Sequence, residues 1–96
     1  MERVNLSIGP LSFHMADYDA ESDVLYLHVD APEPAEAEET PEGHAIRYAF
    51  GSDRVVGLTM ISPRHILEQE GKLMVTLPDL GAQIVTGGLE RALVAS

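Results

Sequence analysis

The sequence predicts an α+β fold: a single antiparallel β-sheet of four to six strands with a short C-terminal helix packed on it. Apolar side chains recur at every second position through most of the chain, which is the period of a half-buried strand. Glycine, proline, aspartate and serine separate these alternating runs, as they do between paired strands. With 96 residues and no cysteine, the chain fits one small domain over 1–96, whose core is thin.

The N-terminal region alternates on both sides of Gly9-Pro10. Residues 4–8 and 11–16 each place apolar side chains on one face, which predicts a hairpin, or one strand kinked at that pair. Residues 19–22 are predicted to form the tip of the next hairpin, because they are polar and lack the strand period.

The run 24–29 is predicted to lie at the centre of the sheet. Leu25 and Leu27 share one face, whereas Val24, Tyr26 and His28 share the other. Both faces are largely apolar or aromatic, which is typical of a strand that is covered on both sides or that has one face against a partner chain.

The second half contains a further predicted hairpin and two short helices. Residues 44–50 and 54–61 alternate around a turn at 51–53, with Ile46, Tyr48 and Phe50 expected on one face. Gly57 interrupts the second of these strands and predicts a bulge or a close backbone approach. Residues 62–71 are expected to form a helix of one or two turns, or merely a turn, with Ser62 as its cap, Pro63 at its start and Gly71 at its end. A strand over 72–78 and a short tail helix over 86–96, capped by Thr86, complete the prediction.

Residues 30–43 are the one low-complexity stretch. They contain three prolines, six acidic residues and no large apolar side chain. Burial there cannot offset the entropy of ordering, so we expect an acidic, Pro-rich, extended and mobile loop. The alternative is a solvated edge strand whose charges discourage pairing between edges of different molecules.

Charge and composition exclude several classes of protein. Sixteen acidic and six basic residues give a net charge of −10, which argues against binding nucleic acid through its phosphates. The absence of cysteine excludes a zinc–thiolate site and a thiol nucleophile. No apolar stretch has the length of a membrane helix, and no leader is recognisable, so we expect a cytoplasmic protein without a membrane partner.

Two motifs resemble those of a family. The first has the form Tyr-Asp-x-Glu-x-Asp-x-Leu-Tyr-hydrophobic and the second the form Val-Val-Gly-hydrophobic-x-hydrophobic. The residues that carry them are Tyr18, Asp19, Glu21, Asp23, Leu25, Tyr26, Leu27, Val55, Val56, Gly57, Leu58 and Met60. This pattern is similar to that of a small uncharacterised bacterial family, domain of unknown function 2283, over about residues 13–62. The long acidic loop and the lack of a glycine before the second motif depart from the family pattern.

The resemblance implies a small antiparallel sheet, with no assigned activity and no catalytic residue to carry over. Some relatives are encoded beside small toxin-like proteins, which hints at an antitoxin-like or partner-binding role.

Two groups of side chains invite a metal-binding interpretation. Carboxylates alternate at 17, 19, 21 and 23, as in the first half of a calcium loop, but Ser22 replaces the required glycine and His28 replaces the bidentate glutamate. A turn with solvated charges explains this run better. The four histidines, His14, His28, His44 and His65, show no paired metal-ligand spacing, although His14 and His28 would face each other in one strand register. We therefore predict no metal and no cofactor.

Catalytic patterns are also missing from the sequence. No serine stands in a nucleophile elbow, and Gly87-Gly88 lacks the lysine of a phosphate loop. Asp23, at the start of the central strand, is the one carboxylate of interest. We predict a protein that is not an enzyme.

The remaining features favour an interaction module. Ten acidic residues and no lysine or arginine lie between Asp17 and Glu42, which suits either solubility or docking of a basic protein partner. The central strand has two largely apolar faces, which predicts a homodimer unless the C-terminal segment folds over the second of them. The candidate partner-binding residues are Val24, Tyr26, His28, Glu36, Glu38 and Glu39. The alternative is a small-ligand or metal-binding domain that uses the strand histidines.

Overall fold

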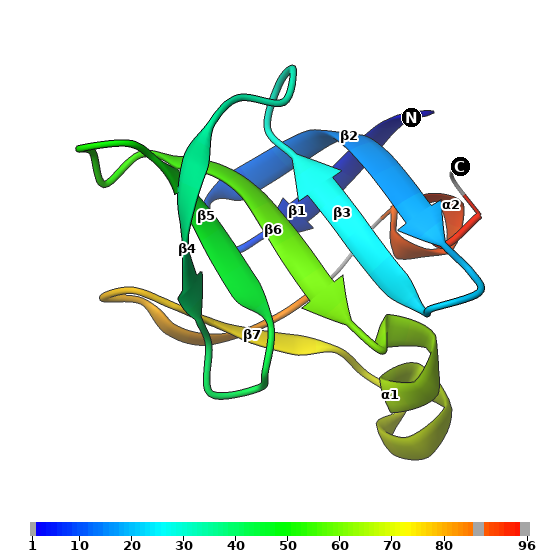
Figure 1. Ribbon diagram of the computed structural model, residues 1–96. Coiled ribbons are helices and arrows are strands. Elements are labelled where there is room, and N and C mark those ends of the chain that lie inside the picture. Colours follow the sequence, from blue (N-terminus) through cyan, green and yellow to red (C-terminus); the bar gives the residue numbers. More distant parts are fainter. Residues whose placement is uncertain (1, 86–87, 95–96) are drawn as a thin grey trace.

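A computed structural model describes residues 2–85 and 88–94 and confirms the predicted α+β class (Figure 1). A six-stranded antiparallel sheet has the order β1-β2-β3-β6-β5-β4, and β7 and β8 form a separate two-stranded hairpin. The strands are β1 (Glu2–Ile8), β2 (Leu11–Asp19), β3 (Val24–His28), β4 (Ala35–Glu39), β5 (Ala45–Ala49), β6 (Val55–Ile61), β7 (Met74–Leu77) and β8 (Gly81–Ile84). The helices are α1 (Pro63–Glu70) and α2 (Leu89–Ala92).

One face of the curled sheet carries the core, which β7 and α2 help to close (Figure 1). The predicted alternation holds: Leu25 and Leu27 of β3 point into this core, together with Leu58 and Met60 of β6. Gly9-Pro10 separates β1 from β2, so these two strands form a hairpin rather than one kinked strand. Strand β3 lies between β2 and β6, in the interior of the sheet as predicted.

The prediction of a mobile loop over 30–43 is wrong for residues 35–39, where the alternative of a solvated edge strand is confirmed. Residues 35–39 form β4, which pairs with β5 along its whole length and makes one edge of the sheet. The chain then turns back through a buried Thr40, whose backbone N–H donates to the carbonyl of His44 at 2.7 Å. Backbone pairing needs no large apolar side chain, so an Ala-Glu sequence can occupy an edge strand.

Helix α1 begins and ends where the sequence predicts, but its cap comes from elsewhere. The Ser62 side chain makes no capping hydrogen bond. Instead, the Asp23 carboxylate accepts hydrogen bonds from the backbone N–H groups of Arg64 and His65, both at 3.1 Å. Gly71 ends the helix with a φ of 75°, and its N–H donates to the Leu67 carbonyl.

The C-terminal region departs from expectation at three points. Strand β8 was not predicted, because its short sequence has little apolar character. Phe50 lies in the turn after β5, with 62% of its surface exposed, instead of facing the core. Helix α2 packs on β1 and β2 and contributes Ala92 and Leu93 to the main core, so the alternative in which this segment covers the second face of β3 is wrong. Thr86 lies outside the described residues.

Candidate functional site: an acidic cleft and an open sheet face

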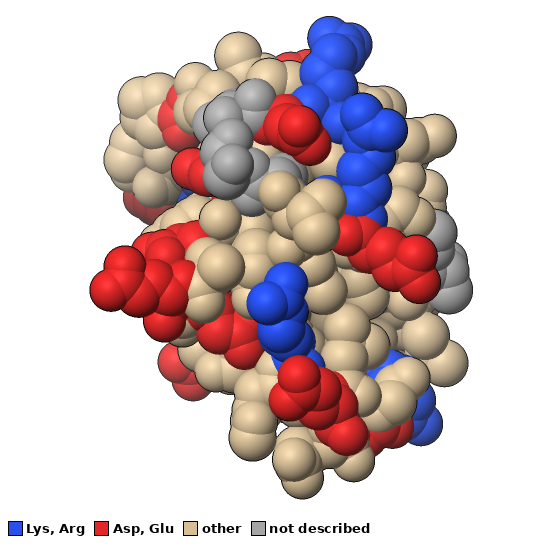
Figure 2. Space-filling view, turned by 90° about the vertical axis from the view of Figure 1, so that its right-hand side faces the viewer, with Lys and Arg blue, Asp and Glu red and all other residues tan. Residues whose placement is uncertain are grey.

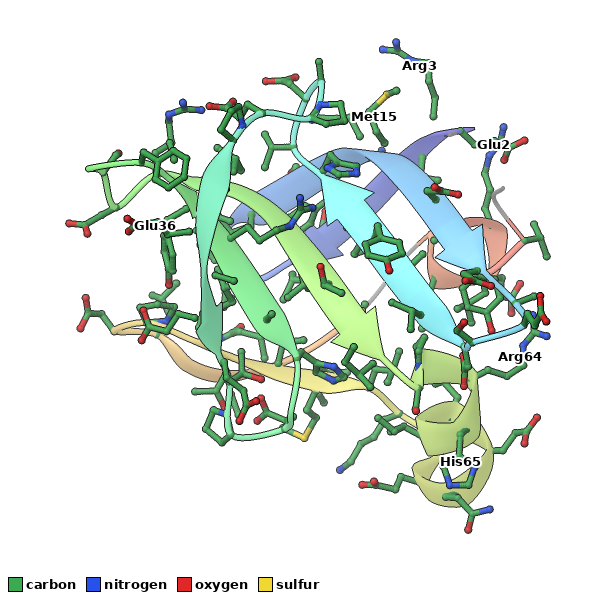
Figure 3. The ribbon with its side chains drawn as sticks, in the orientation of Figure 1. Glu2, Arg3, Met15, Glu36, Arg64 and His65 are labelled. Carbon is green, nitrogen blue, oxygen red and sulfur yellow. The ribbon has the colours of Figure 1, made fainter. Side chains whose placement is uncertain are left out.

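An acidic cleft of about 470 Å3 lies between the sheet and the β7–β8 turn. Four carboxylates from three separate parts of the chain line it: Glu36 and Glu38 on β4, Asp53 in the β5–β6 turn and Asp79 in the β7–β8 turn. The apolar walls come from Leu11, Tyr48, Val55, Leu77, Pro78 and Leu80. In Figure 3, the labelled Glu36 stands beside β4 at this edge of the sheet. The cleft therefore combines negative charge with apolar surface.

The cleft continues along β4. A second hollow of about 150 Å3 shares Glu38, Tyr48, Leu77 and Pro78 with the first and extends to Thr40. The two hollows together form a groove between the edge strand and β7.

The negative charges of the acidic cleft affect the pKa of Tyr48. Burial raises the pKa of this phenol, and the nearby carboxylates of Glu38, Asp53 and Asp79 raise it further. No lysine or arginine is among the residues that line the cleft. Within residues 2–85 and 88–94, the one ion pair is that of Arg54 with Glu33, at 2.9 Å. The four cleft carboxylates are thus unpaired by any described cation.

The charges on another side of the molecule are mixed. Figure 2 looks onto the side that carries α1 and α2, where blue and red side chains alternate across the surface. Because both signs are interspersed there, this side offers a basic partner no concentrated field.

The second candidate surface is the face of the sheet that points away from the core, which we call the open face. In Figure 1 nothing lies in front of β3 and most of β6 among the described elements, whereas β4 crosses in front of β5. Cross-strand pairs place Asp17, Tyr26 and Thr59 in one row, and Val24 and Ile61 in the next. Tyr26 is 39% exposed and Ile61 is 44% exposed. The open face thus presents aromatic and aliphatic side chains to solvent.

Arg47 occupies the centre of the open face. Its Nη2 donates to the carbonyl of Leu27 at 2.8 Å and lies 3.1 Å from Nδ1 of His28. Because a guanidinium only donates, this Nδ1 is the acceptor and the His28 proton is on Nε2. Burial lowers the pKa of His28, and the charge of Arg47 lowers it further against the opposing effect of Asp17. The Nε of Arg47 is buried and has no hydrogen-bond partner among the described residues.

Gly57 makes this arrangement possible. It pairs with both His28 and Arg47 in neighbouring strands, and the Arg47 side chain lies where a Cβ of residue 57 would be. The predicted close approach at this glycine is confirmed, and the register shift between Arg47 and Tyr48 supplies the irregularity that the sequence also suggested.

The six candidate partner-binding residues divide between the two surfaces. Glu36 and Glu38 line the acidic cleft, and Val24 and Tyr26 lie on the open face. Glu39, at the edge of that face, also lines the second hollow. His28 is on the same face but is only 6% exposed, because Arg47 covers it. His28 thus supports Arg47, and its role in partner binding stays a prediction.

Sequence reasoning missed Arg47, Asp53 and Asp79. Asp53 and Asp79 stand in turns, where aspartate is common for backbone reasons, so nothing in the sequence marks them as neighbours of Glu36. The signal for Arg47 was Gly57, which indicates that some group approaches the strand but does not identify it.

Two of the carboxylates between 17 and 23, those of Asp19 and Asp23, serve the local structure. Asp19 accepts hydrogen bonds from the N–H groups of Glu21 and Ser22 at 3.1 and 3.2 Å, which stabilises the β2–β3 turn. Asp23 accepts from the Tyr18 hydroxyl at 2.7 Å in addition to capping α1. Arg64, labelled beside this turn in Figure 3, lies over the Tyr18 ring at 5.1 Å.

The four histidines lie on separate elements. Met15, not His14, pairs with His28 across β2 and β3. Across the described ranges, no three His, Asp or Glu side chains form a group that could hold a metal ion. His44 is 1% exposed, and its Nδ1 accepts from the N–H of Ile61 at 3.0 Å.

Neither a family model, nor a curated protein, nor a solved structure matches this chain. The resemblance to domain of unknown function 2283 therefore stays a prediction. Neither α1 nor α2 has the length and apolar character needed to span a membrane.

Proposed function

We propose that this protein is a non-enzymatic interaction module that binds a basic segment of a partner protein in the acidic cleft. The observation that supports this most directly is the gathering of four carboxylates, from β4 and two distant turns, around apolar walls. Because no described lysine or arginine lines the cleft, its field is available to a partner. An antitoxin-like role, covering the basic surface of a small toxin, is one form of this function.

The chemistry of the cleft suits lysine and arginine side chains. Their apolar stems can pack against Leu77 and Leu80 while the charged heads reach Glu38 and Asp79. Tyr48 adds an aromatic ring at which a guanidinium can be attracted. A volume of about 470 Å3 accommodates a few side chains, so we expect an extended segment of the partner to enter it.

The experiment uses two fluorescent peptides of equal positive charge. One alternates arginine with leucine, and the other is oligolysine without apolar residues. We expect the arginine–leucine peptide to bind more tightly, because it meets both the carboxylates and the apolar walls, and we expect added salt to weaken its binding. Fluorescence anisotropy measures both affinities.

Charge-reversal variants distinguish the cleft from the general acidity of the chain. Glu38→Lys with Asp79→Lys should weaken binding of the arginine–leucine peptide by about tenfold or more. Glu21→Lys with Glu68→Lys makes the same change in net charge at exposed positions elsewhere and should leave most of the affinity. Equal losses in both double variants would contradict a specific site and indicate unspecific attraction.

The metal-binding alternative has no support among the described residues, where the histidines are dispersed and no group of ligands could hold an ion.

A further inference from the structure

We propose that a second copy of this chain covers the open face, in a homodimer whose two-fold axis runs along β3 and through Tyr26. The surface involved is separate from the acidic cleft, so this inference does not rest on the proposed function. It concerns Met15, Asp17, Val24, Tyr26, Arg47 and Ile61.

The centre of the open face is the part of this acidic chain where a like-charged copy can approach. The rows of cross-strand pairs on β3, β6 and β5 contain one ionised side chain, that of Arg47, between Ala45, Gly57, Thr59 and Tyr26. The carboxylates of Asp17, Asp19 and Glu39 lie on the flanking strands, the first two on β2 and the third on β4. Since the chain carries a net charge of −10, contact at any strongly acidic surface would be repelled.

The distribution of charge around Tyr26 is self-complementary. Asp17 is its direct neighbour on β2. On the other side, the Arg47 guanidinium reaches the backbone of β3 at the Leu27 carbonyl. A rotation of 180° about a line along β3 exchanges these two sides. It therefore brings Arg47 of one copy opposite Asp17 of the partner subunit, and the symmetry makes this contact occur two times in the dimer.

The same rotation suits the packing of sheets. It keeps the strand directions of the two copies aligned, which is the usual arrangement when two twisted sheets pack face to face. Tyr26 then meets Tyr26 of the partner subunit at the axis, and aromatic residues are enriched at the centres of such interfaces. Val24 on β3 and the neighbouring Ile61 and Met15 extend the apolar contact on both sides of the axis.

Other occupants fit this surface less well. Helix α2 already packs on β1 and β2, so the described part of the C-terminal segment does not reach it. A basic partner would meet Arg47 at the centre. A second copy supplies both the carboxylate that Arg47 lacks and an apolar surface of the same shape.

The test measures the dimer dissociation constant by sedimentation over a concentration series. Tyr26→Glu places two carboxylates at the axis and should raise the dissociation constant on the order of 30-fold or more. Ile84→Glu makes a matched change at an exposed apolar residue of β8 and should leave it unchanged. Thermal melting followed by circular dichroism shows whether each variant is folded.

A second variant separates the proposed contact from a general effect of charge. Asp17→Arg lowers the net negative charge, so unspecific association would become tighter, whereas the proposed contact would become weaker because two cations then face each other. Glu21→Arg makes the same change in charge away from the face and should not weaken the dimer. A monomeric wild-type protein, a dimer that survives Tyr26→Glu, or a tighter dimer with Asp17→Arg would each overturn the proposal.

Discussion

At the scale of single residues, Asp23 joins three elements. It adopts a φ of 55°, a left-handed conformation that aspartate tolerates better than most residues, at the entry to β3. Burial raises the pKa of this carboxyl, but the hydrogen bonds from the Tyr18 hydroxyl and from the N–H groups of His65 and Arg64 outweigh burial and leave the pKa below its usual value. Asp23 is the carboxylate that the sequence analysis singled out among possible catalytic groups, and its hydrogen bonds give it a structural role.

Removing this carboxylate should destabilise the fold. Asp23→Ala leaves the N-terminus of α1 uncapped and the Tyr18 hydroxyl without its acceptor, so we expect the free energy of unfolding to fall by about 2 kcal/mol. Asp23→Asn keeps a capping oxygen and should cost less. Urea denaturation measures both values. Asp30→Ala, an exposed control in the β3–β4 connection, should change the free energy by less than about 0.5 kcal/mol.

At the scale of elements, the contact between β3 and β6 depends on the absence of a side chain at Gly57. A Cβ there would stand 2.8 Å from the backbone carbonyl of Leu27 and would overlap the Arg47 side chain. The arginine can move, but the carbonyl belongs to the neighbouring strand. The two central strands would have to separate locally to accept any larger residue.

Gly57→Ala should consequently lower the free energy of unfolding by about 1–3 kcal/mol, as overpacking of a core commonly does. The double variant Arg47→Ala/Gly57→Ala tests the cause. Removal of the arginine relieves one of the two clashes, so the cost of the alanine at 57 should be smaller in the Arg47→Ala background and still greater than zero. Equal costs in both backgrounds would mean that Arg47 does not lie over this glycine in solution.

Strand β4 shows how an element can form without an apolar pattern. Its alanines and glutamates bury almost nothing, and Tyr48 and Ile46 on the paired strand β5 provide the contact with the core. The glutamates keep the free edge charged, which discourages the pairing of edges between molecules. The same glutamates, on the side toward β7, form part of the acidic cleft.

At the scale of the whole molecule, two buried histidines link stability to pH. Burial lowers the pKa of His28 and of His44; the charge of Arg47 adds to this at His28, whereas Glu42 opposes it at His44. Below an unfolded-state pKa of about 6.5, the unfolded chain binds protons that the folded chain does not. These histidines therefore leave stability intact above that pH and reduce it progressively as the pH falls below it.

The contribution of His44 can be measured by comparing variants. The net negative charge also decreases on acidification, which relieves repulsion, so the difference between wild type and variant is the quantity to follow. We expect the free energy of unfolding of wild type to decrease between pH 7 and pH 5 relative to that of His44→Gln. His65→Gln, at an exposed position of α1, should follow wild type. Parallel curves for wild type and His44→Gln would contradict the assignment.

Much of the fold could be predicted from local patterns. Alternation identified β1, β2, β3, β5, β6 and β7, because each buries one face over most of its length. The assignment of faces within β2 was wrong beyond Phe13, since Ala16 rather than Met15 is buried where the pairing with β1 shifts register. The limits of α1 followed from Pro63 and Gly71, whose backbone preferences are intrinsic to the residues. Strand β8 escaped prediction, and β4 was given only as the alternative to a loop, because pairing with a neighbour, not burial, holds both in place.

The candidate surfaces could be predicted only in part. The acidic composition and the second apolar face of β3 are properties of the chain itself, since they follow from residue types and from alternation along one strand. Whether Glu36 meets Asp53 and Asp79 or remains isolated depends on how two turns and an edge strand converge. The position of Arg47 over Gly57 likewise depends on the register between β5 and β6. Such distances between residues far apart in the chain arise from packing, for which a single sequence holds no local signal.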